Sequence, residues 1–571
     1  MRRRRPADRS PRRPRTGALR RCAIALSGAV RRADARARAR RSRGRAHIVR
    51  RDTAGGTGDA IALHRRLSLP ADALALHAAL TDRGERSDTM LFERTVGPTL
   101  ILDAAALRIV ARGQRVTAEA LSANGENLLA LLVDRLLVHV TDSAPTAVQF
   151  DFPRPTGDDP AARLAAPSPF DVLRAALAPV SRSPEEPFTL ALPGIVAFDH
   201  VDLFEDLPAN AADPLDFPDL VFWVAESLVV IDPGAPPRLI CTAFGSADAA
   251  ASTRAFNDAS QRLTALVARC AAAPPFAPVP VAALNDHRAE TDLDDAAYRA
   301  VVSAMREHIA AGEVYQIVPS RSFRLPCSDP YAAYAALRAF DPSPYRYYVT
   351  APDHTLFGAS PETSVRVYRE FGTAMVEVKP IAGTRPRGAS PDADDRQEAD
   401  MRLDTKELAE HMMLVDLARN DVARVSTSGT RRIARLMTTE RYARVMHLVS
   451  SVTGQLREGH DGLHALVACL NVGTLSGAPK LRATQLLRGV EATKRGPYGG
   501  AIGWLNGDGD IDTGVVIRTA VVQDAIATVR AGAGVVHDSD PQAEADETRR
   551  KADAVLGIIA GVEAAGGASN A

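Results

Sequence analysis

The sequence predicts an α+β fold, in which strands and helices follow one another without the regular alternation of a doubly wound parallel sheet. Two observations support this class. Short apolar runs broken by Gly and Asp predict strands between residues 88 and 150, and long helical periods appear after residue 294. The chain has 571 residues, of which 46% are hydrophobic, so it can bury one large core or two ordinary ones.

The first predicted elements are strands followed by a helix. The strands cover residues 90–92, 99–102 and 107–110, and the helix covers 126–137. Pro and Ala accumulate over residues 271–280, which indicates an extended connector and divides the folded body into regions 51–280 and 281–571. In the second region we expect a helix over 296–311 and strands over 345–351, 374–378 and 528–536.

Arginine is concentrated at the start of the chain. Residues 1–50 contain 19 Arg and two acidic residues, Asp8 and Asp34. The composition of this leader fits an organellar transit peptide, a disordered basic arm or an over-extended reading frame, and we favour the last because the segment has nothing that would offset the cost of ordering a core. Residues 51–571 carry 51 basic and 67 acidic side chains. Such an acidic body is not expected to bind nucleic acid or an anionic membrane surface.

The cysteine pattern and the hydropathy of the chain indicate the cellular compartment in which the protein works. The five cysteines have no C-x-x-C or other metal-ligand spacing, which favours a reducing compartment over a disulfide framework. The sequence has no run of 18 or more apolar residues. We therefore expect a cytoplasmic protein.

Two acidic helices are candidates for a metal site. A helical period places Glu407, Glu410 and His411 on one face. A second acidic helix start, with Glu544 and Glu547, follows much later in the chain. One carboxylate from each helix can hold Mg²⁺ while waters and substrate oxygens complete its ligands. A solvated helical face is the alternative explanation of this spacing.

A histidine and several glycine turns are further candidates. His447 lies in the apolar run 445–449, where an imidazole needs a hydrogen bond or a function, and a hydrogen-bonded core histidine is the alternative. Glycine turns near residues 383, 473, 499 and 532 offer backbone amides to a carboxylate, and Arg385, Arg387 and Arg518 lie beside such turns. The chain has neither a G-x-S-x-G elbow nor a G-x-C-x-G turn, so it lacks the signatures of a serine hydrolase and of a glutamine amidotransferase.

Six sequence strings carry a family resemblance. The strings VKPIAGTRPRG, KELAEHMMLVDLARND, ERYARVMHLVSSVTG, NVGTLSGAPKLRA, RGPYGGAIGW and AGAGVVHDSDPQAEADETRRKA resemble the chorismate-binding enzymes in their family order. Within that family, the chain is most similar to the large subunits of anthranilate synthases. The resemblance is dense from residue 313 to residue 559 and looser over 90–132 and 194–208.

The resemblance implies a fold, a reaction and a set of site residues. The fold has two β-sheets packed face to face with helices outside. In the reaction, chorismate and ammonia give aminodeoxyisochorismate, which loses pyruvate to yield anthranilate, the first step of tryptophan biosynthesis. Glu410 and Glu547 match the ligands of Mg²⁺, with Glu407 and Glu544 one turn before them, and His447 and Thr474 match catalytic positions. The positions that match substrate contacts are Gly383, Thr384, Tyr498, Arg518, Gly532, Ala533 and Gly534.

This reaction requires an acid, a base and a source of ammonia. Glu407 is the candidate acid for departure of the C4 hydroxyl, and His447 is suited to remove the C2 proton because an unperturbed imidazole has a pKa of about 6.5. Gln316 and Ala382 stand where water-adding and aminodeoxychorismate-forming relatives carry lysines, so ammonia is the expected nucleophile. Because the chain lacks an amidotransferase motif, ammonia is expected from a separate glutamine amidotransferase subunit in a heteromer, for which a heterotetramer is common in the family.

The resemblance also implies an effector site for tryptophan, at which this chain departs from the family. Arg94 replaces a serine, Asp341 an asparagine, Arg346 a methionine and Gly514 a cysteine. The matching positions are Glu93, Arg94, Pro344, Tyr345 and Arg346. The long cationic side chains of Arg94 and Arg346 should fill a pocket shaped for an indole or change its charge. We therefore expect weakened or lost inhibition by tryptophan. Compensation, in which Arg346 pairs with Asp341 or Glu93, is the alternative.

Two other functions are kept as alternatives. A relative from specialised metabolism would stop at aminodeoxyisochorismate, although His447 and Thr474 favour the complete reaction. A nucleic-acid-binding or scaffold protein would use the Arg-rich leader, and deletion of residues 1–50 would separate this function from catalysis.

Overall fold

The structure is a computed structural model that describes residues 56–67, 72–179, 181–210, 212–277, 287–442, 445–491 and 493–569. The alternatives for residues 1–50 lie outside the described residues. All described residues belong to one compact unit. Among them, none of the helices combines the length and the apolar character that crossing a membrane requires.

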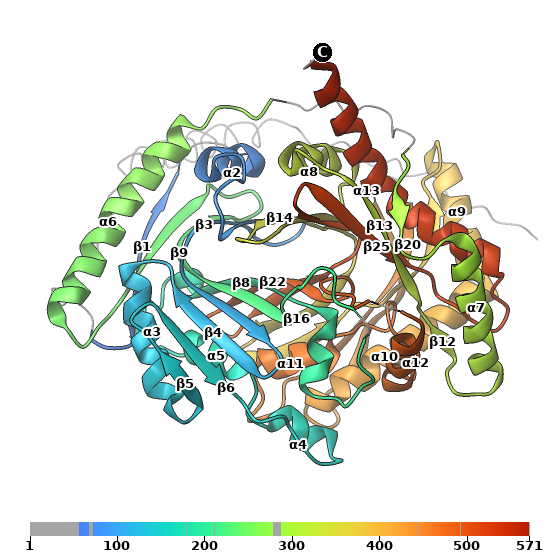
Figure 1. Ribbon diagram of the computed structural model, residues 1–571, viewed down its shortest axis with the longest axis horizontal. Coiled ribbons are helices and arrows are strands. Elements are labelled where there is room, and N and C mark those ends of the chain that lie inside the picture. Colours follow the sequence, from blue (N-terminus) through green and yellow to red (C-terminus); the bar gives the residue numbers. More distant parts are fainter. Residues whose placement is uncertain are drawn as a thin grey trace, which may run out of the picture. The chain divides into compact units, whose positions relative to one another are not determined.

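Two long strands belong to both of the sheets (Figure 1). β3 (Thr99–Arg112) pairs with β9 (Leu220–Ile231), with shifts of register between Leu102 and Leu107. Before the shifts β3 also pairs with β2 (Thr89–Arg94), and after them it pairs with β4 (Arg115–Ala120). The bulges therefore carry β3 from the first sheet into the second.

The first sheet contains strands from both ends of the chain. Its order is β7 (Ser181–Arg182), β1 (Asp59–Arg66), β10 (Arg238–Phe244), β9, β3, β2, β14 (Tyr345–Thr350), β15 (Thr355–Ser360), β24 (Thr519–Gln523), β25 (Ile526–Gly532), β13 (Ser320–Pro326) and β11 (Glu290–Thr291). Among the described strands, the pairing of β1 with β7 is parallel and the other pairings of this sheet are antiparallel.

The second sheet is antiparallel throughout its described strands. Its order is β5 (Val140–Ser143), β6 (Ala147–Asp151), β4, β3, β9, β8 (Ala191–Val196), β22 (Ala501–Asn506), β23 (Ile511–Val515), β16 (Thr363–Glu370), β17 (Thr373–Val378) and β20 (Val445–Gln455), which also pairs with β18 (Ile381–Pro386) and β19 (Arg432–Arg441). A separate ladder joins β12 (Gln316–Ile317) to β21 (Gly477–Ala478).

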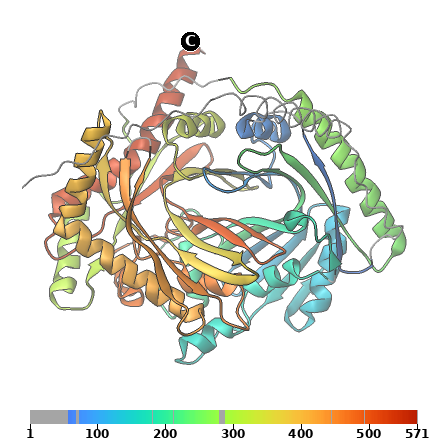
Figure 2. The same cartoon turned by 180° about the vertical axis from the view of Figure 1, so that it is seen from behind.

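The sheets and helices form four layers, and Figure 2 shows from behind that the helices lie outside the strands. Buried apolar side chains of β2, β14 and β24 meet those of β8, β9 and β22 between the sheets, with Trp223 fully buried there. The first sheet is covered by α2 (Ala73–Thr81), α6 (Ala249–Ala272), α8 (Pro330–Phe340) and α13 (Pro541–Ser569). The second is covered by α3 (Ala123–Arg135), α5 (Phe170–Leu177), α10 (Thr405–Val425) and α11 (Gly462–Cys469).

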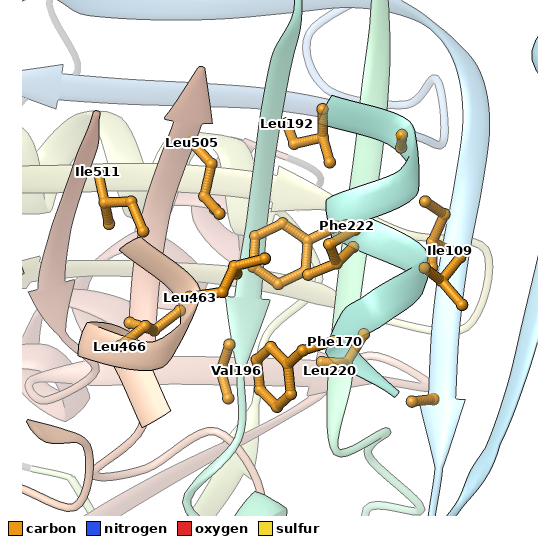
Figure 3. Close-up of a cluster of buried hydrophobic side chains, with 14 of the residues drawn as sticks. Ile109, Phe170, Leu192, Val196, Leu220, Phe222, Leu463, Leu466, Leu505 and Ile511 are labelled. Atoms are coloured by element: carbon orange, nitrogen blue, oxygen red, sulfur yellow. The ribbon is translucent and has the colours of Figure 1, made fainter. Parts of the chain in front are cut away.

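The packing of helices on the second sheet is seen in Figure 3. Phe170 of α5 and Leu463 of α11 pack against Phe222 of β9 and Leu505 of β22. Removing this apolar surface from water stabilises the fold. The remaining helices of the described residues are α4 (Pro160–Ala165), α7 (Asp295–Ala310), α9 (Pro391–Leu403) and α12 (Lys480–Val490), together with short 3₁₀ turns at Leu137–His139, Pro187–Thr189 and Phe198–Leu203.

The predicted α+β class with two packed sheets is confirmed. The helix predicted over 126–137 is α3, which begins earlier because Ser122 accepts a hydrogen bond from the backbone N–H of Gly125. The separate strands predicted over 99–102 and 107–110 are wrong, because bulges join them into β3. The strand predicted over 528–536 ends at Gly532, where a glycine-rich loop begins. Strand pairs such as β2 with β14 join segments from the two sides of residue 280. The division of the chain into two regions at that residue therefore stays a prediction.

Candidate active site

Helices α10 and α13 bring carboxylates within electrostatic reach of one another. Asp404 caps α10 by accepting hydrogen bonds from the backbone N–H groups of Lys406 and Glu407, at 3.0 and 3.2 Å. Burial raises the pKa of Glu410, and the negative charges of Glu407 and of Glu547 on α13 raise it further. Both predicted acidic clusters therefore contribute to one negative region.

The cations around this region leave it incompletely neutralised. Glu407 forms an ion pair with Arg385 at 3.1 Å, and Glu547 forms one with Lys551 at 2.7 Å. Glu410 has no cationic partner among the described residues and accepts only a neutral hydrogen bond, from Nε2 of Gln316 at 3.2 Å. The pKa of Glu410 is raised because a buried negative charge without a cationic partner is unfavourable.

The chemistry of these donors fits a hard divalent cation. Oxygen ligands from one or two carboxylates, completed by water and substrate, are typical of Mg²⁺ sites. Within the described residues, no three His, Cys, Asp or Glu side chains are gathered tightly enough to enclose a metal ion by themselves. A cation at Glu410 and Glu547 would therefore have to take further oxygens from water or substrate.

His447 lies beside the glycine turn of β18. Its Nδ1–H donates to the carbonyl of Gly383 at 3.1 Å and lies 3.0 Å from the hydroxyl of Thr384. Its Nε2 is buried and has no hydrogen-bond partner among the described residues. Burial lowers the pKa of His447, so the ring is neutral near pH 7. The hydrogen bond to a carbonyl fixes the proton on Nδ1 and leaves Nε2 as a free acceptor.

The turn at Gly383 connects this histidine to α10. The pairing of β18 with β20 shifts register between Ala382 and Thr384, and Gly383 has a φ of 75°. A Cβ placed on Gly383 would lie 3.5 Å from Oε2 of Glu407. Gly383 and Thr384 therefore lie between His447 and the acidic face of α10.

Glu362 is a candidate that the sequence analysis missed. It is buried in the turn between β15 and β16, where its Oε1 accepts a hydrogen bond from the hydroxyl of Thr474 at 2.9 Å. Burial raises the pKa of Glu362 to about 7. A glutamate in the string FGASPETSV, between two apolar strand patterns, was the available signal. Thr474 thus positions an acid that titrates near neutral pH.

Arg518 supplies a positive charge to the same region. It adopts a φ of 50° just before β24, a conformation that costs energy for a non-glycine residue. Its charge lowers the pKa values of both Glu362 and His447, so all three lie within electrostatic reach. Its guanidinium also donates to Oδ2 of Asp341 at 3.3 Å.

The loop after β25 closes the site. A Cβ on Gly532 would lie 3.0 Å from the hydroxyl of Tyr498, and a Cβ on Gly534 would lie 2.7 Å from Nε2 of Gln316. Side chains at these two positions would therefore displace Tyr498 or Gln316. Between them, Ala533 is fully buried. The structure thus brings the predicted residues of α10, β18 and β20, Arg518 just before β24, and this loop to one region.

Arg385 and Arg387 form ion pairs with carboxylates of this chain. Arg385 donates to Asp400, Asp404 and Glu407, while Arg387 forms an ion pair with Asp394 at 2.5 Å. Both guanidinium groups are therefore engaged within the chain. Arg518 has the fewer internal partners of the three and stays the better candidate for an external carboxylate.

Paired side chains fill the predicted effector position. The register of β2 and β14 places Arg94 opposite Tyr345. The guanidinium of Arg94 lies 4.1 Å from the centre of the Tyr345 ring and forms an ion pair with the buried Asp512, which also accepts a hydrogen bond from the Tyr345 hydroxyl at 3.0 Å. A Cβ on Gly514 would lie 2.7 Å from this ring.

The second substituted cation is also partly compensated. Arg346 lies opposite Glu93 in the same pair of strands, with 3.8 Å between their charged atoms. Glu93 is buried and accepts hydrogen bonds from the Tyr334 hydroxyl at 2.7 Å and from Nε of Arg338 at 2.9 Å. The neighbouring Pro344 accepts a hydrogen bond from the backbone N–H of Thr95 at 3.1 Å. One of the two compensating pairs considered from sequence, Arg346 with Glu93, is therefore present.

Comparisons with known proteins found similar sequences and a similar fold. The sequence pattern of a family described as chorismate binding enzyme matches residues 149–557. The chain is 46% identical to the anthranilate synthase component 1 of Vibrio cholerae serotype O1, over 87% of this chain and 96% of that relative. It is also 46% identical to the anthranilate synthase component 1, pyocyanine specific, of Pseudomonas aeruginosa, over 80% of this chain and 86% of that relative. It resembles the crystal structure of anthranilate synthase component I from Streptococcus pneumoniae TIGR4 with a TM-score of 0.64 and 28% identity, over 81% and 92% of the two chains.

Proposed function

The chain belongs to the chorismate-binding enzymes, and from this premise we propose that it is an anthranilate synthase large subunit. It converts chorismate and ammonia to anthranilate and pyruvate, through aminodeoxyisochorismate. The observation that carries this proposal is that the pKa values of two groups near Arg518, Glu362 and His447, are shifted in opposite directions. The pKa of Glu362 is raised to about 7 and that of His447 is lowered, so one site holds a protonated acid and a neutral base near pH 7.

The two carboxylates of chorismate are held at opposite ends of the site. Arg518 and the backbone amides around Gly532 and Gly534 bind the enolpyruvyl carboxylate. The ring carboxylate lies towards α10 and α13, where Glu410 and Glu547 would hold Mg²⁺. The bound ion would neutralise the ring carboxylate and draw electron density from the diene. Glu407 and Glu544, one turn earlier on these helices, keep the surrounding field negative.

Glu362 donates the proton that departs with the C4 hydroxyl. We assign this step to Glu362 rather than to Glu407, because Glu407 already forms an ion pair with Arg385 at 3.1 Å. Burial keeps Glu362 protonated up to about pH 7, and the hydroxyl of Thr474 orients it. A general acid in this range suits a reaction at neutral pH.

His447 removes the C2 proton in the second step. Its Nδ1–H is held by the carbonyl of Gly383, so Nε2 accepts the proton. The electron pair of the C2–H bond forms the new ring double bond as the C3–O bond breaks, and the enolate of pyruvate that leaves takes up a proton to become pyruvate; formation of the aromatic ring drives the step. A relative without this base would accumulate aminodeoxyisochorismate, which is the alternative product.

Ammonia is the nucleophile because neither residue 316 nor residue 382 is a lysine that could activate water or attack the ring itself. Gln316 is neutral and its amide is engaged by Glu410 at 3.2 Å, and Ala382 has no functional group. Free ammonia needs no deprotonation before it attacks. A separate glutamine amidotransferase subunit supplies it in the cytoplasm, and the anthranilate enters tryptophan biosynthesis.

Regulation by tryptophan is weakened in this chain. Arg94 covers the ring of Tyr345 and is held there by the buried Asp512. An indole entering this position would have to displace a guanidinium from a buried carboxylate, which leaves Asp512 with only the longer ion pair to Arg366, at 3.7 Å. We therefore propose that tryptophan binds poorly at Glu93, Arg94, Pro344, Tyr345 and Arg346.

A single assay tests the proposed function. The full chain is incubated with chorismate, Mg²⁺ and an ammonium salt at alkaline pH, and anthranilate is followed by its fluorescence. Chromatography of the same mixture identifies pyruvate and any aminodeoxyisochorismate. We expect anthranilate and pyruvate in equal amounts, and much slower formation of both with Glu362→Gln. Accumulation of aminodeoxyisochorismate without pyruvate would show the alternative function, and unchanged chorismate would contradict both.

A further inference from the structure

A narrow cavity behind Tyr498 has no role in the proposed reaction. It lies on the face of β13 and β25 that carries Ser322 and Arg324 opposite Arg530 and Thr528. The space between its lining residues, including its open mouth, has a volume of about 430 Å³.

Most of the charge around this cavity is already compensated. Arg530 donates to the hydroxyls of Ser320 and Thr493 at 2.8 and 3.0 Å and lies 3.2 Å from the buried Glu491. Glu491 also pairs with Arg495, at 2.7 Å. Lys494 pairs with Asp213 at 3.1 Å.

Arg324 is the exception on the cavity wall. Among the described residues, its guanidinium has no hydrogen-bond or ion-pair partner, and neither do the hydroxyls of Ser322 and Thr528 beside it. Glu290 lies opposite Arg324 in the pairing of β11 with β13, but it is exposed and forms no ion pair with it within 4.0 Å. One half-buried cation and two hydroxyls therefore face the same space without partners.

The other side of the cavity is apolar. It is closed by Leu215, Val516, Val521 and the side chain of Tyr498. A guanidinium binds a carboxylate through two parallel hydrogen bonds, and a single unpaired guanidinium balances one negative charge. A dianion such as phosphate would need a second free cation, which the described lining does not offer.

We propose that this cavity binds a small aliphatic carboxylate, with its carboxylate on Arg324 and its short apolar end against Val516 and Val521. Pyruvate, which the proposed reaction releases, has one negative charge and a short apolar end, as do carboxylates from other sources such as acetate. The binding itself does not depend on the proposed function, whereas the identification of pyruvate as the occupant rests on it.

Calorimetric titration of the full chain without chorismate tests the proposal. Sodium pyruvate, acetate and phosphate are titrated in parallel at constant ionic strength. We expect one saturable site for pyruvate, weaker binding of acetate because its apolar end is shorter, and no saturable binding of phosphate. Tighter binding of phosphate than of either carboxylate would overturn the assigned chemistry, and so would the absence of saturable carboxylate binding.

Variants locate the site. Arg324→Gln should weaken pyruvate binding by about tenfold or more, and Arg324→Lys, which keeps the charge but not the paired donors, should weaken it less. Arg435→Gln is the matched control, because Arg435 is exposed on β19 and has no side-chain partner among the described residues. Glu290→Gln should bind at least as tightly as the parent chain. Equal affinity of Arg324→Gln and Arg435→Gln, with unchanged melting temperatures, would contradict the proposal, whether or not the chain forms anthranilate.

Discussion

Replacing Glu362 by glutamine separates the cost of burying a carboxylate from its use in catalysis. Burial raises the pKa of Glu362 from 4.5 to about 7 in the folded chain, whereas the hydrogen bond from Thr474 lowers it. In the unfolded chain the pKa returns to its ordinary value. Between pH 4.5 and pH 7 the folded chain therefore binds more protons than the unfolded chain, so the free energy of unfolding falls as the pH rises.

The size of this effect follows from the two pKa values. One pKa unit corresponds to about 1.4 kcal/mol, so the folded chain loses about 3 kcal/mol of stability as the pH rises through this window. The contribution is fully present below pH 4.5 and is lost above pH 7. Glutamine does not titrate, and its amide oxygen still accepts the hydrogen bond from Thr474. Glu362→Gln should therefore gain about 3 kcal/mol relative to the parent chain between pH 4.5 and pH 8.

Urea unfolding followed by circular dichroism at pH 4.5 and pH 8 measures this difference. The matched control is Glu85→Gln, because Glu85 is exposed and its side chain has no partner among the described residues. The control should keep the pH dependence of the parent chain. Anthranilate formation by Glu362→Gln should fall by about 10² to 10⁴-fold. If Glu362→Gln followed the parent chain at both pH values, the carboxyl group would not be buried as described and the assigned acid would be refuted.

Four further outcomes are expected. His447→Ala should keep amination of chorismate but slow the loss of pyruvate, so that aminodeoxyisochorismate accumulates on chromatography; anthranilate formation at the parental rate would exclude His447 as the base. Chelation of divalent metal, or Glu410→Ala, should abolish consumption of chorismate, and an unaffected rate would remove Mg²⁺ from the proposal. Micromolar tryptophan should leave the activity of the parent chain unchanged, and Arg94→Ser should increase the inhibition; half-inhibition of the parent chain would contradict a filled pocket. Burial lowers the pKa of His77 to about 3, so stability that is present above pH 6.5 should be lost as the pH falls towards 3, and a melting temperature that fell equally in His77→Gln would contradict this cause.

Local periodicity was sufficient to predict much of the fold. The helical spacing of Glu407, Glu410 and His411 placed these residues on α10, where His411 is buried and both glutamates face the candidate site. Strand-length apolar runs identified β2, β14 and β17. The bulges of β3 were not predicted, because a shift of register depends on the partner strand β9, which lies more than a hundred residues away.

The electrostatics of the site depended on long-range contacts that the sequence does not show. Glu362 has an ordinary glutamate's sequence context, and its pKa follows from burial and from Thr474, 112 residues later. In the same way, the sequence shows that Arg94 changes the effector site. It does not show that Arg94 pairs with Asp512, which is 418 residues away. Patterns of residue type therefore identified candidate positions, whereas only the folded chain shows which charges are compensated.

Because β3 and β9 pass through both sheets, the two regions of the chain are expected to unfold together. A cut near residue 280 would separate β2 from β14 and β8 from β22, exposing unpaired backbone edges and apolar surface on both fragments. The regions on either side are thus expected to melt together in a single calorimetric transition. Attempts to produce either fragment alone should yield aggregates, and recombining the two fragments during refolding should restore more soluble material than refolding each one separately.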